Sequence, residues 1–468
     1  MKITTICCVG AGYVGGPTMA VIAQQCPEIK IIVVDQSAER IAAWNHQDLD
    51  QLPVYEPGLK EIVAAVRNKN LFFSTDIDYG IKAAEMIFMA VNTPTKTKGP
   101  GKGMAADLTH VEACAKKIAA VANAPKIVIE KSTLPVRTAE KIKEVLENNK
   151  SGFSFEVLSN PEFLAEGTAI ADLYKSDRVL IGGEDTPSGK AAVNALISIY
   201  KRWIPEEKII TTNVWSSELS KLASNAMLAQ RISSINGLSA LCEKTGASIE
   251  EVAKAIGMDH RIGNKFLNVS VGFGGSCFQK DILNLVYLCQ TYGLTEVANY
   301  WMQIIEINNY QKNRFAHRIL SFIPEKIQHP AVAILGWAFK KNTNDSRESA
   351  AIYVTAALLE KGIIVQVYDP MVTEERMKMD LEMLFEAKRK TPEQVKELLD
   401  LFQFKSSIDA ALTQTHAAGI ITEWDEFAAY DWKTFLNNAS DHYALLDGRS
   451  LIKKGLSEKL FSVGNSKT

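Results

Sequence analysis

The chain has 468 residues, is 47% hydrophobic and 23% charged, and carries a formal net charge of −2. Its length predicts two or three domains. The near-neutral balance argues against nucleic-acid binding and against a basic helix on a membrane surface. No apolar run approaches the roughly 20 residues that span a bilayer, and no leader precedes the first motif. The seven cysteines form no C-x-x-C pair, so we expect neither disulfides nor a metal site, and a reducing, cytoplasmic location.

The N-terminal part alternates strand and helix patterns. Apolar runs at 3–9 and 31–35 flank a helix-length segment that opens at Gly12, which is a βαβ pattern. A helical pattern covers 107–123. Further strands are predicted at 71–74, 86–91, 126–130 and 155–159. This alternation predicts a parallel, doubly wound sheet.

The middle of the chain is helical. Residues 216–241 contain no proline and carry apolar residues on most faces, which predicts a long, largely buried helix. Helical patterns continue to about residue 320, and Pro324 and Pro330 mark a boundary.

A second α/β pattern follows the two prolines. The predicted elements are strands at 331–335, 363–368, 417–422 and 443–447 and a helix at 347–361. Residues 372–403 are charge-rich and read as a solvated helical excursion, and the polar tail after Phe461 is expected to be disordered. The fold prediction is two Rossmann-like domains joined by a helical domain, with boundaries at 1–211, 212–322 and 323–468.

The first predicted turn carries a glycine pattern typical of dinucleotide binding. Gly10 allows the tight turn, Gly12 lets a pyrophosphate approach the backbone, and Gly15 lets helix and strand pack closely. Asp35 ends the next strand, where it would bind the ribose hydroxyls and repel a 2′-phosphate, so NAD is favoured over NADP. Arg40 weakens that preference. The alternative is a glycine turn without a ligand. The whole run is Gly10, Ala11, Gly12, Tyr13, Val14 and Gly15.

Three further loops follow predicted strands at the sheet edge where ligands bind. Two of them are rich in hydroxyls and proline, and they could equally be turns that cap helices. Their residues are Val91, Asn92, Thr93, Pro94 and Thr95 in one, and Ser132, Thr133 and Leu134 in the other. The third loop holds Glu162 and Glu166, either of which could activate water as a general base; the alternative is a pair of solvated acids.

Two groups outside these loops could carry chemistry. Lys221 and Asn225 share one face of the long helix among apolar neighbours, a setting that lowers an ammonium pKa and suits proton transfer. Alternatively, Lys221 reaches solvent along the helix surface. Cys277 follows a glycine-rich bend and precedes a predicted helix, whose unpaired first amides favour the reactive thiolate. Asp281 is four residues further on. Cysteines are more often structural.

The C-terminal α/β pattern repeats the arrangement of loop after strand. Lys340 follows its first strand and could pair with a phosphate. Asp345 or Ser346 is predicted to cap the next helix, and Arg449 follows a later strand. The alternative for these basic residues is ordinary surface charge.

These motifs, in this order, resemble the nucleotide-sugar dehydrogenases of the UDP-glucose/GDP-mannose dehydrogenase family. The resemblance covers nearly the whole chain. It is carried by GAGYVGGPT, VNTPTKT, EKSTLPVR, LSNPEFLAEGTA, WSSELSKLASNA, VGFGGSCFQKD and AFKKNT. It implies oxidation of C6 of UDP-glucose to a carboxylate with two NAD.

The resemblance assigns catalytic roles position by position. Cys277 resembles the nucleophile that adds to the C6 aldehyde and carries the thioester formed by the second hydride transfer. Glu162 resembles the base that hydrolyses the thioester. Lys221 and Asp281 resemble the acid–base and water-organising pair, and Asn225 helps to hold the oxyanion.

The resemblance also implies ligand contacts. Thr133 lies near the active-site water, and Arg261 resembles an arginine donated by a neighbouring subunit, so a homo-oligomer is implied, a dimer or a hexamer of dimers. NAD contacts are Gly10 to Gly15, Asp35, Arg40, Val91 to Thr95, Ser132, Thr133, Leu134, Glu166, Lys280 and Arg347. Contacts to the sugar nucleotide are Glu162, Phe163, Leu164, Ala165, Glu166, Lys221, Asn225, Arg261, Asn268, Val269, Ser270, Val271, Gly272, Phe273, Gly274, Phe339, Lys340 and Arg449.

Three other functions remain open at this point. The same chemistry could act on GDP-mannose or a UDP-N-acetylhexosamine. A two-electron alcohol dehydrogenase would not need Cys277. A catalytically dead nucleotide-sugar sensor would be expected to have lost Cys277, Lys221 or Asp281, and all three are present.

Overall fold

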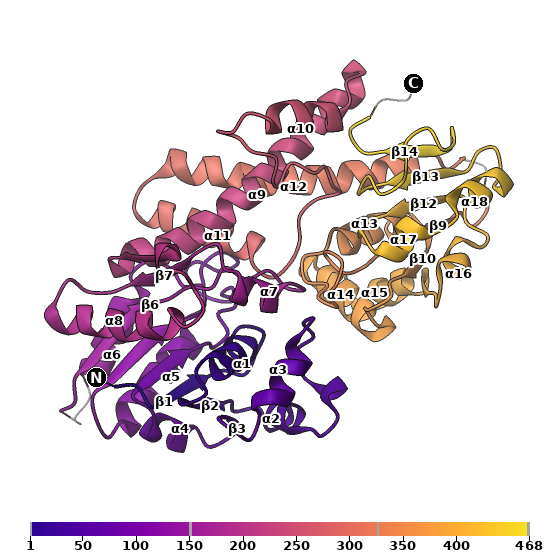
Figure 1. The fold of residues 1–468 in the computed structure, drawn as a ribbon. Helices are drawn as coiled ribbons and strands as arrows, with labels where there is room; N and C mark the ends of the chain where they lie inside the picture. Colours follow the sequence, from indigo (N-terminus) through magenta and orange to yellow (C-terminus); the bar gives the residue numbers. More distant parts are fainter. Residues whose placement is uncertain (1, 149–151, 325–326, 466–468) are drawn as a thin grey trace. The chain divides into compact units, whose positions relative to one another are not determined.

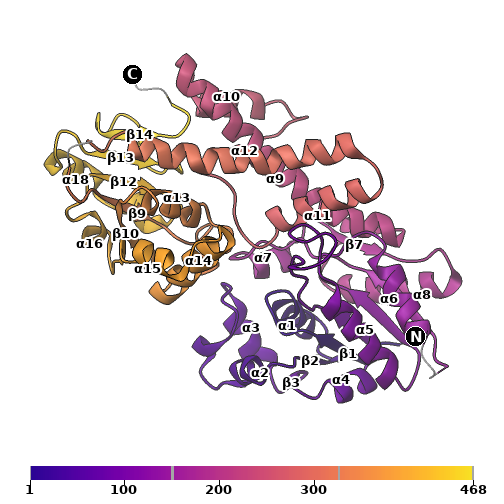
Figure 2. The ribbon, with the colours of Figure 1, turned by 180° about the vertical axis from the view of Figure 1, so that it is seen from behind.

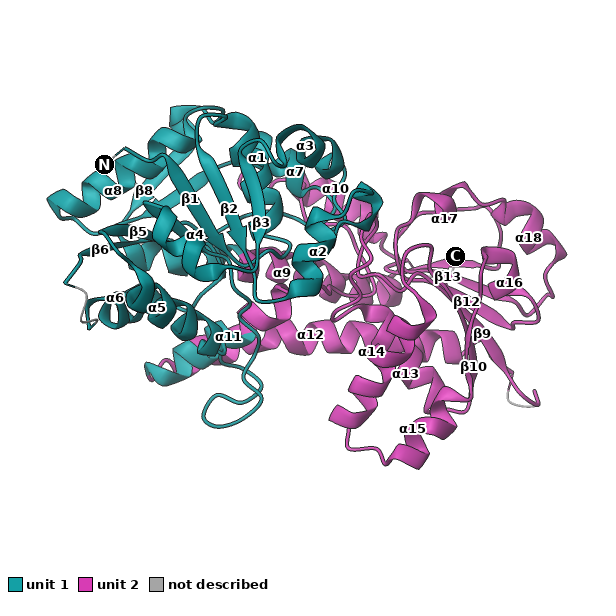
Figure 3. Cartoon of the chain, turned by 90° about the horizontal axis from the view of Figure 1, so that it is seen from below, with its two compact units in different colours: residues 1–224, 283–292 teal, residues 225–282, 293–468 magenta. Residues whose placement is uncertain are grey.

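The computed structural model describes residues 2–148, 152–324 and 327–465, and in it the chain divides into two compact units. Unit 1 comprises residues 1–224 and 283–292, and unit 2 comprises residues 225–282 and 293–468 (Figure 3). Two helices, α9 (Val214–Thr245) and α11 (Phe278–Thr291), run from one unit into the other. None of the described helices combines the length and apolar character needed to cross a membrane.

Within its described residues, unit 1 is built on an eight-stranded sheet with the order β3-β2-β1-β4-β5-β6-β7-β8 (Figure 1). The strands are β1 (Thr5–Val9), β2 (Lys30–Val34), β3 (Leu71–Ser74), β4 (Met86–Met89), β5 (Lys126–Glu130), β6 (Phe155–Ser159), β7 (Val179–Gly182) and β8 (Ile209–Thr212). Strands β3 to β6 follow the predicted doubly wound pattern. The added strand β7 departs from the parallel pattern, because it pairs with β6 in antiparallel fashion through Ser159 and Gly182.

Helices cover both faces of this sheet because alternate strand residues face opposite sides. Ile6 and Cys8 belong to one core, together with residues of α1, α3, α7 and α8. Cys7 and Val9 belong to the other, with residues of α4, α5 and α6. The helices are α1 (Gly15–Gln25), α2 (Ala38–Asn45), α3 (Leu59–Val66), α4 (Ile77–Ala83), α5 (Thr109–Val121), α6 (Thr138–Glu147), α7 (Ala169–Tyr174) and α8 (Pro187–Tyr200).

Unit 2 contains a six-stranded sheet in its described part, with all its pairings parallel and the order β11-β10-β9-β12-β13-β14. The strands are β9 (Ala331–Leu335), β10 (Ile364–Tyr368), β11 (Phe402–Phe404), β12 (Ala417–Ile420), β13 (Ala444–Asp447) and β14 (Leu460–Ser462). The disordered tail expected after Phe461 is wrong as far as residue 465, because β14 pairs with β13 and Asn465 forms a bridge with Ser248. Residues 466–468 lie outside the described residues.

Helix α12 packs against the sheet of unit 2. Helix α12 lies along α13 (Figure 2), and its Phe315 and Ile319 join the core of the sheet. The helices are α10 (Ile249–Gly257), α12 (Thr295–Leu320), α13 (Ala350–Leu359), α14 (Glu374–Ala387), α15 (Pro392–Leu399), α16 (Ile408–Leu412), α17 (Asp425–Ala429) and α18 (Trp432–Asn438). The two doubly wound sheets and the long helix predicted from the sequence are thus confirmed.

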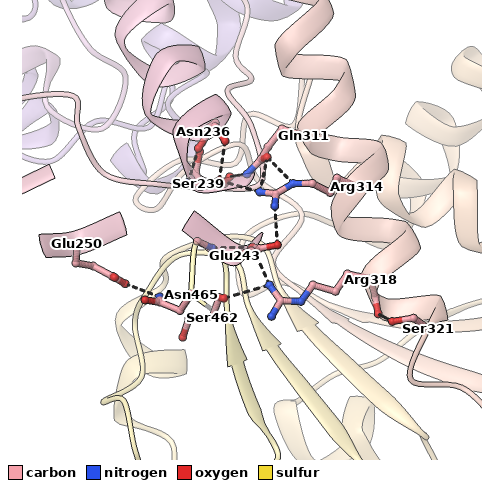
Figure 4. Close-up of polar contacts among 12 residues, drawn as sticks. Asn236, Ser239, Glu243, Glu250, Gln311, Arg314, Arg318, Ser321, Ser462 and Asn465 are labelled. Atoms are coloured by element: carbon pink, nitrogen blue, oxygen red, sulfur yellow. Dashed lines mark hydrogen bonds and ion pairs between the residues drawn. The ribbon is translucent and has the colours of Figure 1, made fainter. Parts of the chain in front are cut away.

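Glu243 connects three segments of unit 2, which are α9 itself, α12 and the segment after β14 (Figure 4). Its carboxylate accepts hydrogen bonds from Arg314 at 2.7 Å, from Arg318 at 2.9 Å and from the N–H of Gly464 at 2.8 Å. The carboxylate therefore ties α9 to α12 and to the segment that follows β14.

Replacing Glu243 with glutamine should lower the stability of unit 2 noticeably. The substitution leaves two largely buried guanidinium groups without a counter-charge, which costs about 3 kcal/mol. Urea denaturation should show a lower midpoint with an unchanged slope. Glu306→Gln, at an exposed position on α12, is the matched control and should leave the midpoint unchanged. Equal midpoints for the two variants would contradict the anchoring role.

Candidate active site

The glycine turn of unit 1 leaves room for a ligand at one position only. Gly10 has φ +111°, and a Cβ there would lie 2.3 Å from the carbonyl oxygen of Ala90. A Cβ at Gly15 would lie 2.0 Å from the oxygen of Gly10, whereas one at Gly12 would meet nothing within 4 Å. The backbone is thus tightly packed at Gly10 and Gly15 and open at Gly12, next to the start of α1, as pyrophosphate binding requires.

Asp35 stands directly after β2, as predicted. Its carboxylate accepts hydrogen bonds from the N–H groups of Ala11 and Ser37 and from Arg40, each at 2.9 Å. Burial acts to raise the pKa of Asp35, but these hydrogen bonds outweigh it and lower the pKa below its usual value. The carboxylate is therefore ionised at neutral pH beside the glycine turn, which fits the binding of ribose hydroxyls. Arg40, which was expected to weaken the preference for NAD over NADP, donates one of these hydrogen bonds to Asp35.

The two hydroxyl-rich loops of unit 1 lie against each other. The Ser132 hydroxyl donates to the carbonyl oxygen of Val91 at 2.7 Å, and that of Thr93 donates to the oxygen of Thr133 at 3.3 Å. Residue Thr95 forms an isolated bridge with Ala106. The structure therefore brings the predicted loops together, just beyond β4 and β5.

Glu162 and Lys221 form a buried ion pair within unit 1. The Glu162 Oε1 atom lies 3.3 Å from Lys221 Nζ, and both side chains are less than a tenth exposed. Oε2 of Glu162 accepts the N–H of Leu164 at 2.6 Å. The ring of Phe163 lies near two cations, with its centroid 5.3 Å from Lys221 Nζ and 3.8 Å from the guanidinium of Arg178. The alternatives of a solvated Glu162 and a solvent-reaching Lys221 are therefore wrong.

A second buried lysine, which the sequence analysis missed, stands beside this pair. Lys131 donates to Asn160 at 3.1 Å and to the hydroxyl of Tyr200 at 3.3 Å. Burial lowers the pKa of Lys131 to about 8. The negative charge of Glu162 acts to raise this pKa, and the positive charge of Lys221 acts to lower it. The available signal was a charged pair, Glu130 and Lys131, directly after the apolar residues 127–129.

Glu166 lies on the loop that follows Glu162. The carboxylate of another residue, Glu56, fixes the end of this loop. Glu56 accepts hydrogen bonds from the N–H groups of Gly167 at 2.8 Å and Ala169 at 3.0 Å. Glu56 thus holds the start of α7, and the sequence analysis did not single it out.

The loop that leads to Cys277 in unit 2 is held by helix α12. Asn308 accepts the N–H of Phe273 at 2.8 Å and donates to its oxygen at 3.1 Å, and Gln311 donates to the oxygen of Ser270 at 2.6 Å. Gly272 has φ +138°, and a Cβ there would lie 2.8 Å from Asn308 Oδ1. Glycine is required at this bend because both its backbone and its surroundings exclude a side chain.

Cys277 immediately precedes α11, as predicted, and is half-buried. Its carbonyl accepts the N–H of Asp281 at 2.8 Å, and its sulfur lies 3.5 Å from the hydroxyl of Ser276. Asp281 is buried and accepts a hydrogen bond from Asn225 at 2.6 Å, with Lys280 Nζ at 3.7 Å. Unit 2 therefore presents a thiol at a helix start, one turn from a buried carboxylate.

The predicted nucleotide-binding residues of unit 2 lie beside the same loop. The N–H of Gly275 donates to the oxygen of Arg347 at 2.8 Å, and a Cβ on Gly275 would lie 3.0 Å from the ring of Phe339. Arg449 donates to the oxygen of Phe339 at 2.9 Å. Lys340 Nζ lies 5.5 Å from the same ring. Aromatic and cationic side chains suited to a base and phosphates thus gather next to the loop before Cys277.

Two details differ from the predictions for this region. The helix after β9 is capped by neither Asp345 nor Ser346, because α13 begins at Ala350 with Ser349 as its cap. Asp345 instead binds the guanidinium of Arg347, and Ser346 donates to Asp380.

Arg261 does not reach the loop before Cys277 in this chain. Its guanidinium pairs with Asp259 at 2.6 Å, and its side chain is 79% exposed. At the start of the loop, Asn268 is exposed and Val269 is buried. The sequence analysis predicted that Arg261 contacts the sugar nucleotide bound to a second copy of the chain.

Comparison with known families places all three parts of the sequence. Residues 4–204 match the NAD binding domain of the UDP-glucose/GDP-mannose dehydrogenase family, residues 215–310 match its central domain and residues 333–454 match its UDP binding domain. The chain belongs to this family. The family and the NAD binding domain expected from the motifs are therefore confirmed.

Curated relatives match over nearly the whole chain. The chain is 55% identical over 460 residues to UDP-glucose 6-dehydrogenase of Drosophila melanogaster, which covers 98% of this chain and 94% of the fly protein. It is 54% identical over 465 residues to UDP-glucose 6-dehydrogenase of Mus musculus, with coverage of 99% and 92%. A solved UDP-glucose dehydrogenase from Pyrobaculum islandicum is 28% identical with a TM-score of 0.81, covering 98% of this chain and 97% of the other.

Proposed function

We propose that the chain catalyses the NAD-dependent, four-electron oxidation of UDP-glucose to UDP-glucuronate. Cys277 carries this proposal, because a thiol at a helix start is what distinguishes oxidation to the acid from oxidation to the aldehyde. Support comes from the glycine turn beside Asp35 in unit 1, from the aromatic and cationic residues around the loop of Cys277 in unit 2, and from relatives named for this reaction.

The proposed route consists of two hydride transfers and one hydrolysis. Bound NAD supplies the acceptor for each hydride. In the first step a hydrogen leaves C6 as hydride, and the proton of the C6 hydroxyl passes to water held by Lys221 and Asp281, which gives the aldehyde. The Cys277 thiolate then adds to C6 as the aldehyde oxygen takes up a proton. Loss of a second hydride from C6 and of the hydroxyl proton from this thiohemiacetal gives a thioester. Water activated by Glu162 displaces the Cys277 thiol and releases the carboxylate.

The remaining residues bind and orient. Asp281 and Asn225 are already hydrogen-bonded to each other and are proposed to organise water and the oxyanion, with Thr133 near the water. The proposed contacts to NAD and to the sugar nucleotide are those implied by the family resemblance. We further propose that the chain forms a homo-oligomer in which Arg261 serves a neighbouring copy, with domains at 1–211, 212–322 and 323–468.

Counting NADH against sugar tests the function directly. The purified enzyme with limiting UDP-glucose and excess NAD should release two NADH for each sugar consumed, and the product should be the acid. GDP-mannose and UDP-N-acetylglucosamine serve as the control substrates and should react at least tenfold more slowly. One NADH per sugar with an aldehyde product would overturn the proposal, as would a preference for either control substrate.

A further inference from the structure

Two buried carboxyl groups meet inside unit 1, away from the residues assigned to catalysis. Glu130 ends strand β5 and is 1% exposed, and Glu218 lies on α9 and is 3% exposed. The two carboxyl groups lie close enough to each other to interact. Across the described residues, neither carboxyl oxygen of Glu130 accepts a hydrogen bond from an N–H or O–H group.

A hydrogen bond between the two carboxyl groups requires a proton on one of them, because an ionised carboxylate only accepts. The strand neighbours of Glu130 are Met89 on β4 and Ser159 on β6, and neither is charged. Burial raises the pKa of Glu130 well above its usual range, and the negative charge of Glu218 raises it further.

The pKa of Glu218 is raised by burial to about 7, although the backbone amides at the start of α6 act to lower it. The nearby cations are engaged elsewhere. Lys131 donates to Asn160 and Tyr200. The Arg137 guanidinium lies 5.1 Å from the Trp215 ring and 3.7 Å from Glu140.

The pair also fixes the loop between β5 and α6. The oxygens of Glu218 accept the N–H groups of Arg137 and Ala139, each at 2.8 Å. Arg137 has φ +75° immediately before α6. Glu130 is directly followed by this loop, which includes Ser132 and Thr133. The carboxyl pair therefore joins both ends of loop 131–137 to helix α9, three residues before Lys221.

We propose that Glu130 and Glu218 are positioning residues that share one proton and thereby hold loop 131–137 in the conformation that binds NAD. The role in NAD binding rests on the proposed function of Ser132, Thr133 and Leu134. When the shared proton is lost, two carboxylates face each other in an apolar interior and repel, which loosens the loop.

The direction of the pH dependence follows from the raised pKa values. Because both carboxyl pKa values lie above those of the unfolded chain, the stabilisation is fully present at acid pH and is lost as pH rises through the folded-state value of the pair, at about 7 or above. The KM for NAD should rise over that interval, by at most about tenfold per pH unit since one proton is released.

The variant Glu130→Gln removes the shared proton but keeps the size of the side chain and its ability to donate a hydrogen bond. The glutamine amide can donate to Glu218 at every pH, so the loop stays held without a shared proton. We expect wild type to show an infrared band of a buried protonated carboxyl near pH 6 that is lost on titration, and the variant to lack it. The KM for NAD should rise with pH in wild type and stay flat in the variant. Glu147→Gln, exposed on α6, should behave like wild type.

The two measurements separate the pair from the proposed function. The infrared band requires no substrate, so its absence from wild type, or its persistence in both Glu130→Gln and Glu218→Gln, would overturn the shared proton whatever the enzyme oxidises. An identical rise of the KM for NAD in wild type and Glu130→Gln would overturn the positioning role. If Glu130→Gln does not fold, the loss of the band in Glu218→Gln and the titration of wild type decide the question.

Discussion

Replacing Cys277 with alanine is expected to abolish the formation of UDP-glucuronate. The proposed thioester cannot form without the sulfur, so the turnover number for acid should fall by at least about 10³-fold. The side chain is only half-buried and the loop before it is held by hydrogen bonds from Asn308 and Gln311. The substitution should therefore leave the fold and the binding of UDP-glucose intact. Chromatographic assay of the acid, together with the count of NADH, measures the effect.

The matched control for this prediction is another cysteine of the same helix. Cys289 lies on α11 and is buried, and burial raises the pKa of its thiol above the usual value. A thiol with a raised pKa is a poor nucleophile at neutral pH. Cys289→Ala should keep the wild-type ratio of two NADH per sugar. The same ratio in Cys277→Ala would refute the covalent route.

Local sequence patterns predicted the elements whose signal is local. The glycine turn at Gly10 and the apolar strands around it have a fixed spacing, so the first βαβ unit could be placed within a residue or two. Strand β14 escaped prediction because Leu460–Ser462 is short and acquires its strand conformation only by pairing with β13. The antiparallel β7 was missed for the same reason, since pairing direction is a long-range property.

The predictions for the candidate site divide in the same way, into those that depend on local sequence and those that depend on long-range contacts. The positions of Asp35 after a strand and of Cys277 before a helix could be predicted, because a glycine turn or a glycine bend adjacent in sequence indicates each of them. The pairing of Glu162 with Lys221 was beyond sequence spacing alone, because a strand-end loop and a distant helix meet only in the folded unit. Glu130 was taken as the end of an ordinary strand. Its meaning depends on Glu218 and on the engagement of the nearby cations Lys131 and Arg137 with other groups, which no local pattern encodes.

Replacing Glu162 with glutamine should uncouple the two halves of the reaction. The hydride transfers do not require a base at Glu162, whereas hydrolysis of the thioester does. The first turnover should then release about two NADH per active site as a burst, followed by a steady state slower than wild type by about 10²- to 10⁴-fold. Stopped-flow absorbance of NADH measures both phases, and mass spectrometry of the quenched protein should find the sugar nucleotide attached at Cys277.

The geometry of Glu162 makes this variant a clean test. Its Oε1 lies 3.3 Å from Lys221 and its Oε2 accepts the N–H of Leu164. The glutamine oxygen can keep one of these contacts, so the loop should remain in place while the basic group is lost. Glu156→Gln, on the strand β6 that leads to this loop, should show no burst and a wild-type steady state. A Glu162→Gln enzyme with no burst, or with a steady state within a few-fold of wild type, would remove Glu162 from the hydrolytic step and leave Lys131, whose pKa of about 8 lies close enough to neutrality for proton transfer, as the neighbouring group to test.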